Sequence, residues 1–337
     1  MTAPLRIVVL AGGRSAEREV SLRSGAAVAA ALRRGGHDVH ELDPAACNLE
    51  MVDWRAFQAV NQPAAAIAPV DAVFLALHGE FGEDGQVQQI LERAGVPYTG
   101  SGPEASRIAF SKFAAKEAFR RDGIPTPDWE VLRAEDSPED WRLAADRIGL
   151  PLVVKPDQQG SSLGVTIVTD WGQFDAALAE SFRYDRVGLI ERAIPGEEWT
   201  VAVLDDLPLP PIRIESSHLF FDFHAKYAAD DTRFVFDDRP PACVTETALA
   251  ACRALDVRGI SRVDLRLDEA GRPWVLEVNT VPGMTDRSLA PRAAARIGWD
   301  MTEFCERVLC SALEGARRQN AYGLSDRPGS RPHRRAG

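Results

Sequence analysis

The stretch 261–280 reads SRVDLRLDEAGRPWVLEVNT, and the fold of the chain is predicted outward from it. Apolar and polar residues alternate on both sides of residues 269–272, which predicts two antiparallel strands joined by a four-residue hairpin loop. With such a loop Asp268 lies opposite Pro273, and the register of every pair further along the hairpin follows from that first pair.

In this register Asp264 faces Glu277, and Arg262 faces Asn279 on the same side of the sheet. Directly opposed carboxylates destabilise a hairpin unless a positive charge neutralises them. A hard cation does so, and Mg²⁺ accepts carboxylate and amide oxygens together with nucleotide phosphates. The pattern therefore predicts a metal site formed by Asp264, Glu277 and Asn279. The solvated face of an edge hairpin is the alternative that the spacing leaves open.

A second segment, residues 155–164 with the sequence KPDQQGSSLG, places a lysine at the end of a predicted strand and small residues behind it. Glycine and serine let backbone N–H groups approach an anion, and Lys155 supplies a fixed positive charge, so the segment is typical of a loop that covers a phosphate. It matches neither the P-loop fingerprint nor the glycine fingerprint of dinucleotide-binding proteins. A plain hairpin turn is the alternative.

The N-terminal third alternates between predicted strands and helices. Residues 5–11 and 71–77 are apolar strands, residues 20–34 and 86–94 are helices ended by glycine, and this repeated order predicts a parallel α/β layer. The loop 11–22 leaves the C-terminal end of the first strand, where ligands of open α/β sheets bind. Glu17 lies in this loop, with a solvated position in the first turn of the helix as the alternative.

The rest of the chain predicts two mixed units. A long helix at 104–121 and a proline-containing link at 124–127 place the first domain boundary near residue 104. Strands are predicted at 129–132, 151–155, 165–169 and 187–193, and helices at 138–148, 174–182, 246–255 and 302–317. The polar, Asp-rich stretch 216–241 is too long for an ordinary connection and is typical of a lid. The sequence contains no internal repeat.

Composition bounds the class of protein. The 337 residues carry a net charge of −11, which disfavours binding to nucleic acid, and no apolar run is long enough to span a membrane. The first residues read as a strand rather than a signal peptide, and the five cysteines lack zinc-site spacing, so a cytoplasmic protein with reduced thiols is expected. Residues 319–337, rich in Arg, Pro, Gly and Ser, are expected to form a disordered tail.

Taken in order, these segments resemble the D-alanine:D-alanine ligases, a family of the ATP-grasp superfamily. The resemblance covers the chain from about residue 7 to the C-terminal helix. The segments that carry it are 12–24, 77–85 (LHGEFGEDG), 97–102 (PYTGSG), 155–164, 224–227 (HAKY), 262–264 (RVD) and 277–285 (EVNTVPGMT). Each is a modest signal alone, but their common order is specific.

The resemblance implies an ATP-grasp architecture of α/β and α+β class. It implies a parallel α/β substrate domain at 1–104, a central ATP-grasp subdomain at 105–195, and a C-terminal catalytic subdomain at 196–318 that carries the lid 216–241. It also implies ATP and two Mg²⁺ ions as cofactors, with Mn²⁺ as an alternative metal. The expected partners are the small molecules D-alanine and ATP and a second copy of the chain in a homodimer, with no nucleic acid and no membrane.

The resemblance further assigns roles to individual residues. Glu17 would bind the ammonium of the first D-alanine and, with Ser161 and Tyr227, would form a hydrogen-bonded link that closes the lid. Arg262 and the N–H of Gly283 would face the oxyanion of a tetrahedral intermediate. The other substrate-binding residues would be His78, Ser288 and Leu289, the ATP-binding residues Lys112, Lys155, Ser162, Glu191, Ile194, Glu198, Phe220 and Lys226, and the metal ligands Asp264, Glu277 and Asn279.

Some of these positions have simpler interpretations from the residues alone. His78 could be a core histidine at the end of a strand, Lys112 a surface lysine on a helix, and Tyr227 an aromatic residue packed in a loop. The flanking motifs, rather than these side chains themselves, favour the functional interpretation.

Three positions depart from the family's usual pattern. Ser111 precedes Lys112 where Asp is usual, Gln159 stands where Glu is common, and Asp286 with Arg287 replaces a more usual Ser-His pair. The first two bear on the support of the nucleotide loop, and the third bears on the pocket of the second substrate. None of them removes a predicted metal ligand.

The implied function is an ATP-dependent ligase that joins two D-alanines through an acyl phosphate, for the synthesis of peptidoglycan precursors. Residues 224–227 favour D-alanine as the second substrate, while Asp286 and Arg287 keep D-lactate and D-serine as alternatives. A non-catalytic nucleotide-binding regulator is disfavoured by the complete metal ligands and by Arg262. A nicotinamide dehydrogenase is disfavoured because the glycine fingerprint is absent.

Overall fold

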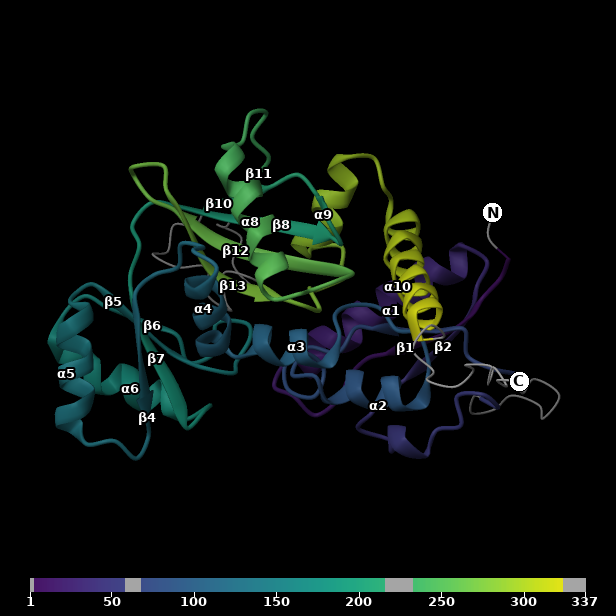
Figure 1. Cartoon of the computed structure of the whole chain (residues 1–337), viewed down its shortest axis with the longest axis horizontal. Helices are drawn as coiled ribbons and strands as arrows, with labels where there is room; N and C mark the ends of the chain where they lie inside the picture. The colour runs from purple at the N-terminus through teal and green to yellow at the C-terminus, as the bar shows by residue number, and fades with distance from the viewer. Residues whose placement is uncertain (1–2, 58–67, 216–232, 324–337) are drawn as a thin grey trace, which may run out of the picture.

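The computed structural model describes residues 3–57, 68–215 and 233–323. Within these ranges the chain forms three β-sheets, and each sheet is covered by helices (Figure 1). One sheet is parallel and the other two are antiparallel, as the predicted α/β and α+β class requires. None of the helices in these ranges combines the length and the apolar character that crossing a bilayer requires.

The first sheet has three parallel strands in the order β2-β1-β3. Its strands are β1 (Arg6–Leu10), β2 (Asp38–Leu42) and β3 (Ala72–Leu75). Helices α1 (Arg18–Arg34) and α10 (Met301–Gly323) pack on one face, and α2 (Gln86–Ala94) packs on the other, so β1 is apolar on both sides. The C-terminal helix α10 therefore returns to the N-terminal sheet, where it lies against α1 (Figure 1).

The helix predicted at 104–121 is in fact two helices, α3 (Pro103–Phe110) and α4 (Lys112–Arg121). Ser111 has an extended backbone, and its hydroxyl accepts a hydrogen bond from the N–H of Ala114. A serine in this conformation caps a new helix, which the apolar periodicity of the segment does not reveal. After the break, α4 packs against strand β13 (Pro273–Asn279) of the third sheet and against helix α8 (Ala242–Ala254) (Figure 1).

The second sheet is antiparallel, with strand order β4-β7-β5-β6. Its strands are β4 (Trp129–Arg133), β5 (Leu152–Pro156), β6 (Thr166–Val168) and β7 (Val187–Arg192). Helices α5 (Pro138–Ile148) and α6 (Phe174–Phe182) pack against it, with a short 3₁₀ turn η3 (Trp171–Gln173) before α6, and they enclose a separate apolar core. A second 3₁₀ turn, η1 (Leu49–Met51), lies beside α2 in the first unit.

The third sheet is also antiparallel, in the order β11-β10-β8-β12-β13 with β9 paired to β8. Its strands are β8 (Glu197–Leu204), β9 (Leu207–Pro208), β10 (Ile212–Glu215), β11 (Arg233–Val235), β12 (Ile260–Leu267) and β13 (Pro273–Asn279). Helices α8 (Ala242–Ala254) and α4 cover one face. The other face packs at one end on α9 (Leu289–Arg296) and carries polar side chains at its other end.

The hairpin of β12 and β13 contains a bulge that the sequence argument did not include. Leu267, not Asp268, lies opposite Pro273, so the expected register is wrong by one residue near the loop. Leu276 is an extra residue in β13, and beyond it Asp264 pairs with Glu277 as predicted. The bulge lets Val275 face the apolar core while Glu277 faces the opposite side.

Other element ends differ from the predictions. Helix α8 starts at Ala242 rather than at residue 246, and α10 continues to Gly323, beyond the predicted helix end at 317 and into the predicted tail. Of the predicted lid, residues 216–232 lie outside the described residues, and Arg233–Val235 forms strand β11. The remainder of the predicted tail, residues 324–337, also lies outside them.

Candidate active site

A small cavity of about 60 Å³ lies where loops of all three sheets meet. It contains eight of the residues predicted from the sequence, which come from segments far apart in the chain. These residues are Glu17, His78, Lys112, Ser161, Arg262, Glu277, Asn279 and Gly283. The motifs identified separately in the sequence therefore form one site.

The opposed carboxylates are neutralised by side chains of the protein itself. Arg262 donates from Nε and Nη2 to the two oxygens of Asp264, at 2.9 and 2.6 Å, and the hydroxyl of Thr200 donates to Asp264 Oδ1 at 2.6 Å. Lys112 Nζ lies 3.6 Å from Glu277 Oε2. The predicted pairing is thus present, but charge repulsion between Asp264 and Glu277 does not by itself require a metal ion.

The donor set nevertheless fits a hard cation. Asp264 and Glu277 face each other across β12 and β13, and Asn279 projects from the same side of β13 two residues further on. Asn279 Oδ1 accepts a hydrogen bond from the N–H of Val281 at 3.0 Å, which orients its amide. Two carboxylates and one amide oxygen are the ligand types that Mg²⁺ takes in nucleotide sites, where phosphates and water complete the coordination.

The glycine- and serine-containing loop after β5 reaches the first helix. The hydroxyl of Ser161 donates to Glu17 Oε1, and Ser161 and Ser162 have positive φ angles of 51° and 58°. Such left-handed conformations cost energy for residues with a side chain and are concentrated at functional loops. A Cβ atom at Gly160 would lie 2.5 Å from Glu17 Oε2, so only glycine lets the carboxylate approach this closely. The predicted contact between Glu17 and Ser161 is present.

Lys112 occupies the first position of α4 and is buried. Its ammonium donates to the carbonyl of Gln159 in the loop after β5, in addition to its ion pair with Glu277. The helix start that places Lys112 is fixed by Asp157, which accepts hydrogen bonds from Ser111 Oγ and from the N–H of Phe113, both at 2.8 Å. In this chain the contact therefore pairs a hydroxyl at position 111, where the family usually has Asp, with the carboxylate of Asp157.

The other predicted nucleotide residues lie along the second and third sheets. Lys155, in β5, forms an ion pair with the buried Glu191 of β7 at 2.6 Å. Glu198, in β8, pairs with Arg266 of β12 at 3.2 Å on the face that carries Asp264. Ile194 lies directly between β7 and β8 and is half-buried. These residues do not line the small cavity; they lie in or next to strands β5, β7 and β8 of the second and third sheets.

His78 connects the first sheet to the loop that follows β13. Its Nδ1 lies 3.0 Å from the carbonyl oxygen of Val281, so Nδ1 carries the proton, and Nε2 accepts from Ser24 Oγ at 3.1 Å. Burial lowers the pKa of His78, which keeps the imidazole neutral. Both ring nitrogens therefore hold the loop around Met284, whose N–H donates to Ser24 Oγ, in place.

Glu83 is a buried member of the cavity that was not predicted as a site residue. Its Oε2 accepts a hydrogen bond from the N–H of Gly79 at 2.7 Å. Burial, together with the nearby carboxylate of Glu17, raises the pKa of Glu83 to about 8. The residue lies in the quoted segment 77–85, and the signal that could have identified it is an acidic residue in a glycine-rich loop at the end of an apolar strand.

The residues predicted for the second substrate lie at the start of α9. Ser288 Oγ accepts from the N–H of Thr285 at 3.1 Å and lies beside Gly283, where a Cβ atom would approach it to 2.7 Å. Leu289 is the first residue of α9 and is buried. Phe220, Lys226 and Tyr227, predicted for ATP binding and lid closure, lie outside the described residues.

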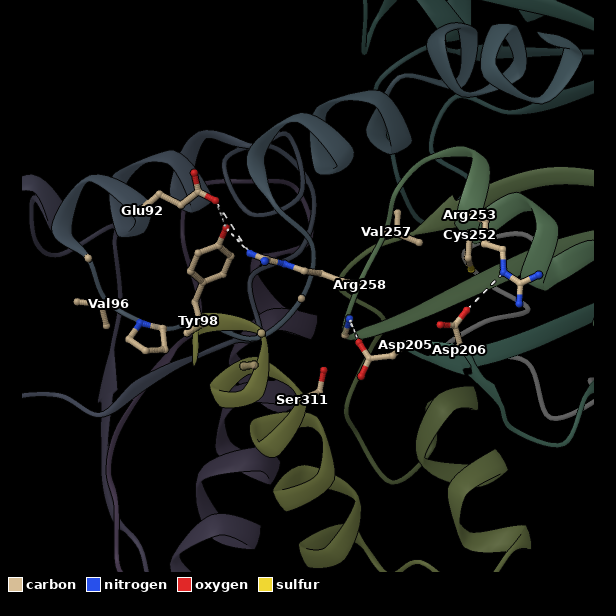
Figure 2. A pocket seen from close by; sticks show the side chains of 17 residues that line it. Glu92, Val96, Tyr98, Asp205, Asp206, Cys252, Arg253, Val257, Arg258 and Ser311 are labelled. Carbon is tan, nitrogen blue, oxygen red and sulfur yellow. Dashed lines mark hydrogen bonds and ion pairs between the residues drawn. The ribbon is translucent and has the colours of Figure 1, made fainter. Parts of the chain in front are cut away.

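A much larger cavity, of about 730 Å³, contains no predicted site residue (Figure 2). Its arginines already have partners: Arg258 Nη2 donates to the hydroxyl of Tyr98 at 3.3 Å and lies 4.0 Å from Glu92 Oε1, and Arg253 Nε donates to Asp206 at 3.4 Å. It lies between the turn after α2, the turn between β8 and β9, and α10 (Figure 2). Volume therefore does not identify the site, whereas the convergence of charged groups in the smaller cavity does.

Two family models match the chain. The model described as "D-ala D-ala ligase N-terminus" matches residues 41–101, and that described as "D-ala D-ala ligase C-terminus" matches residues 118–310. A D-alanine–D-alanine ligase of Chromohalobacter salexigens is 44% identical over 308 residues, which cover 90% of this chain and 93% of that protein. These matches confirm the resemblance found in the sequence motifs.

Solved structures agree. The D-alanine–D-alanine ligase of Bacillus anthracis complexed with ATP superposes with a TM-score of 0.77 at 33% identity, covering 94% of this chain and 99% of that one. The VanG D-Ala:D-Ser ligase of Enterococcus faecalis superposes with a TM-score of 0.76 at 27% identity, covering 92% and 99%. The three-sheet architecture is therefore shared with ligases that differ in the second amino acid named.

Proposed function

The chain belongs to the D-alanine–D-alanine ligase family, and on that premise we propose that it uses ATP to join two D-alanines into D-alanyl-D-alanine, a precursor of peptidoglycan. The observation that carries the proposal is the convergence of Glu17, Arg262 and Glu277 on one cavity. An ammonium-binding carboxylate, an oxyanion-binding guanidinium and a metal-binding carboxylate are the three groups that such a reaction needs. A nucleotide-binding regulator would have no use for the second group.

We divide the chain by function as the sequence suggested. Residues 1–104 form the substrate domain, 105–195 the central ATP-grasp subdomain, and 196–318 the catalytic subdomain. This division is supported by the three separate sheets, although α10 packs on the first of them. The nucleotide then lies between the second and third sheets, and the substrates lie between the third sheet and the first.

Lys112 and Lys155 would bind the phosphates of ATP, with the N–H groups of the loop at Ser161 and Ser162 around them. Lys112 is well placed because its ammonium lies between the loop carbonyl of Gln159 and the carboxylate of Glu277. Ile194, Glu191, Glu198 and Phe220 would surround the adenosine, and Lys226 would complete the phosphate site. Two Mg²⁺ ions held by Asp264, Glu277 and Asn279 would neutralise the phosphates and the charge that develops on them, a role that Mn²⁺ could also fill.

The chain's own residues position the amino acids. Glu17 would bind the ammonium of the first D-alanine, and its contact with Ser161 couples that binding to the nucleotide loop. His78 would hold the neighbouring wall of the site, because both of its ring nitrogens are bonded within the protein. Tyr227 would extend the link between Glu17 and Ser161. Ser288 and Leu289 would receive the second D-alanine next to Gly283.

The reaction would proceed in two steps. The carboxylate of the first D-alanine attacks the γ-phosphate of ATP, which gives an acyl phosphate and ADP. The amine of the second D-alanine, after losing a proton, then attacks the acyl carbon, and phosphate leaves. Arg262 and the N–H of Gly283 would stabilise the oxyanion between attack and departure, where fixed donors are most effective. The rest of the site acts mainly by orienting the reactants.

An assay of ADP release with Mg²⁺ and a panel of D-alanine, D-serine, D-lactate and L-alanine tests this proposal. We expect release to require Mg²⁺ and D-alanine together, and mass spectrometry to show the dipeptide as the main product from pH 6 to pH 9. D-Lactate should be a poor second substrate because its hydroxyl is a weak nucleophile that needs a dedicated base. If a depsipeptide predominates at pH 7, or if D-alanyl-D-serine is the product, the assignment of the second substrate is wrong, but the ligase chemistry still stands.

The assembly and the location are proposals that the family resemblance suggests. We propose a homodimer, which light scattering of the purified chain would test, and a cytoplasmic location, where ATP is available to the enzyme. A mass equal to one chain at micromolar concentration would contradict the dimer.

A further inference from the structure

Lys116 is a wholly buried lysine in α4, one turn beyond Lys112. Burying an ammonium is unfavourable unless charged or polar partners surround it. Its Nζ lies 2.8 Å from Glu191 Oε2, and it donates to Thr126 Oγ1 at 2.8 Å and to the carbonyl of Pro127 at 3.2 Å. Burial lowers the pKa of Lys116 to about 8, against the opposite effect of Glu191. Three oxygens thus fix the position of this group.

Glu191 is shared between two lysines. Its Oε2 faces Lys116, and its Oε1 lies 2.6 Å from the ammonium of Lys155. Burial would raise the pKa of Glu191, but Lys116 and Lys155 lower it further, so it is ionised. Because each oxygen has its own ammonium, the carboxylate cannot rotate without breaking one of the two ion pairs. Lys116 therefore fixes the carboxylate that in turn holds Lys155.

The same lysine is connected to the third sheet. Thr126, which accepts a hydrogen bond from Lys116, donates from Oγ1 to the carbonyl of Val275 in β13 at 2.8 Å. The N–H of Val275 donates back to the carbonyl of Pro125, also at 2.8 Å. The segment that links α4 to β4 is thus attached to the strand that carries Glu277. Helix α4 lies between the second and third sheets, where such a connection is needed (Figure 1).

We propose that Lys116 is a positioning residue for the nucleotide: it orients Lys155 through Glu191 and joins the second sheet to strand β13 through Thr126. The inference rests on the proposed function, since it concerns the side chain expected to bind a phosphate. Lys116 itself is too deeply buried to touch the nucleotide, so its effect must pass through Glu191 and Thr126. This predicts an effect on nucleotide affinity that depends on Glu191.

The test compares Lys116→Met with Arg120→Met. Arg120 lies one turn further along α4 and contacts the ring of Trp129, as Lys116 does, but its guanidinium is exposed and paired with Glu117. We expect Lys116→Met to raise the Kd of Mg-ADP, measured by calorimetry, by about tenfold or more, because one partner of a buried ion pair is lost. The control should change this Kd less than about twofold.

Coupling to Glu191 distinguishes positioning from a general loss of structure. If Lys116 acts through Glu191, the variants Lys116→Met and Glu191→Gln should not be additive, and the double variant should bind Mg-ADP about as weakly as the weaker single variant. The KM for D-alanine should stay within about twofold, since that substrate binds to other residues. Effects that multiply in the double variant would overturn the inference, as would wild-type affinity in Lys116→Met.

A milder variant covers the case in which Lys116→Met does not fold. Thr126→Val keeps the shape of the side chain and removes the hydroxyl that bonds both Lys116 and the carbonyl of Val275, while the ion pair between Lys116 and Glu191 remains. We expect a Kd for Mg-ADP raised about threefold with an unchanged KM for D-alanine, and an unchanged Kd would overturn the connection to β13. If the unaltered protein does not bind Mg-ADP, the proposed function fails and this inference fails with it. If the unaltered protein and Lys116→Met bind Mg-ADP with the same affinity, this inference is wrong and the proposed function still stands.

Discussion

Asp264 lies directly opposite Glu277, although Leu267 lies opposite Pro273 at the loop, a register that differs by one residue from the pairing of the two carboxylates. The extra residue Leu276 makes up the difference. Because Val275 faces the apolar core, strict alternation along β13 would place Glu277 on that same face. The bulge therefore allows one strand to supply a core residue and a cleft carboxylate two positions apart.

Glu277 should be replaceable without loss of the fold. Its side chain is 29% exposed and its ion pair with Lys112 is long, at 3.6 Å. We expect Glu277→Gln to lower turnover by about a hundredfold or more at fixed Mg²⁺, because a metal ligand is weakened, and to shift the melting temperature by less than about 2 °C. Activity assays with a Mg²⁺ titration and calorimetry measure both effects, with Glu269→Gln, in the exposed hairpin loop, as the control.

Asp264→Asn should differ from Glu277→Gln in stability. Asp264 holds Arg262 through two hydrogen bonds and accepts a third from Thr200. The amide removes the charge that neutralises the partly buried guanidinium, so we expect a fall in melting temperature together with the loss of turnover. Equal melting temperatures for the two variants would contradict the ion pair between Asp264 and Arg262.

Swapping Ser111 and Asp157 in a double variant should lower the free energy of unfolding less than the single change Ser111→Asp does. Ser111→Asp places two buried carboxylates in contact, and we expect it to lower the free energy of unfolding by about 2 kcal/mol or more. Adding Asp157→Ser restores a hydroxyl opposite a carboxylate and should recover most of that loss. Urea unfolding of the single and double variants measures the coupling, and simply additive losses would show that the contact does not determine the helix start.

Gly160→Ala should disturb Glu17 without unfolding the protein. The new Cβ atom would lie 2.5 Å from the Glu17 carboxylate, which is the movable end of a side chain. We expect an unchanged melting temperature and a KM for D-alanine raised about tenfold, because the ammonium-binding group is displaced. Gly315→Ala is the matched control, since its Cβ atom would meet no other atom within 4 Å. A KM equal to that of the unaltered protein would separate Glu17 from substrate binding.

Glu83 should make stability depend on pH between about 4.5 and about 8. Its pKa is raised to about 8 in the folded protein, so between 4.5 and 8 the folded state binds more protons than the unfolded state. Stability from this group is therefore fully present below about pH 4.5, falls steadily as pH rises, and is lost by about pH 8. We expect the melting temperature of the unaltered protein to fall relative to that of Glu83→Gln between about pH 5 and about pH 8, and the difference to level off above about pH 8.

A matched variant tests whether this trend belongs to Glu83. Glu80 is in the same loop but is exposed, so Glu80→Gln should follow the unaltered protein at every pH. Thermal scans of the three proteins in one buffer series provide the comparison. A constant difference between Glu83→Gln and the unaltered protein would refute the raised pKa.

Much of the fold followed from local patterns in the sequence. Helices α2, α5 and α6 begin and end at the predicted residues, because the periodicity of their apolar positions and their flanking glycine and proline residues are properties of adjacent residues. The pairing of Asp264 with Glu277 was also predicted, although from a loop register that is wrong at the loop itself. Local errors arose where a single polar residue or an inserted residue decided the geometry, as at Ser111 and Leu276.

Only the tertiary structure decided which distant groups neutralise one another. The sequence placed Arg262 on the same face as the two opposed carboxylates and left a cation or a solvated face as the explanation. Only the packing of helix α4 on the third sheet brings Lys112 beside Glu277. Burial likewise depends on contacts between segments far apart in the chain. It makes Glu83 a weak acid, and it makes Lys116 the partner of Glu191, although both residues have ordinary surroundings in the sequence. The chemistry of single residues can be read along the chain, whereas their charges are set by neighbours that only folding supplies.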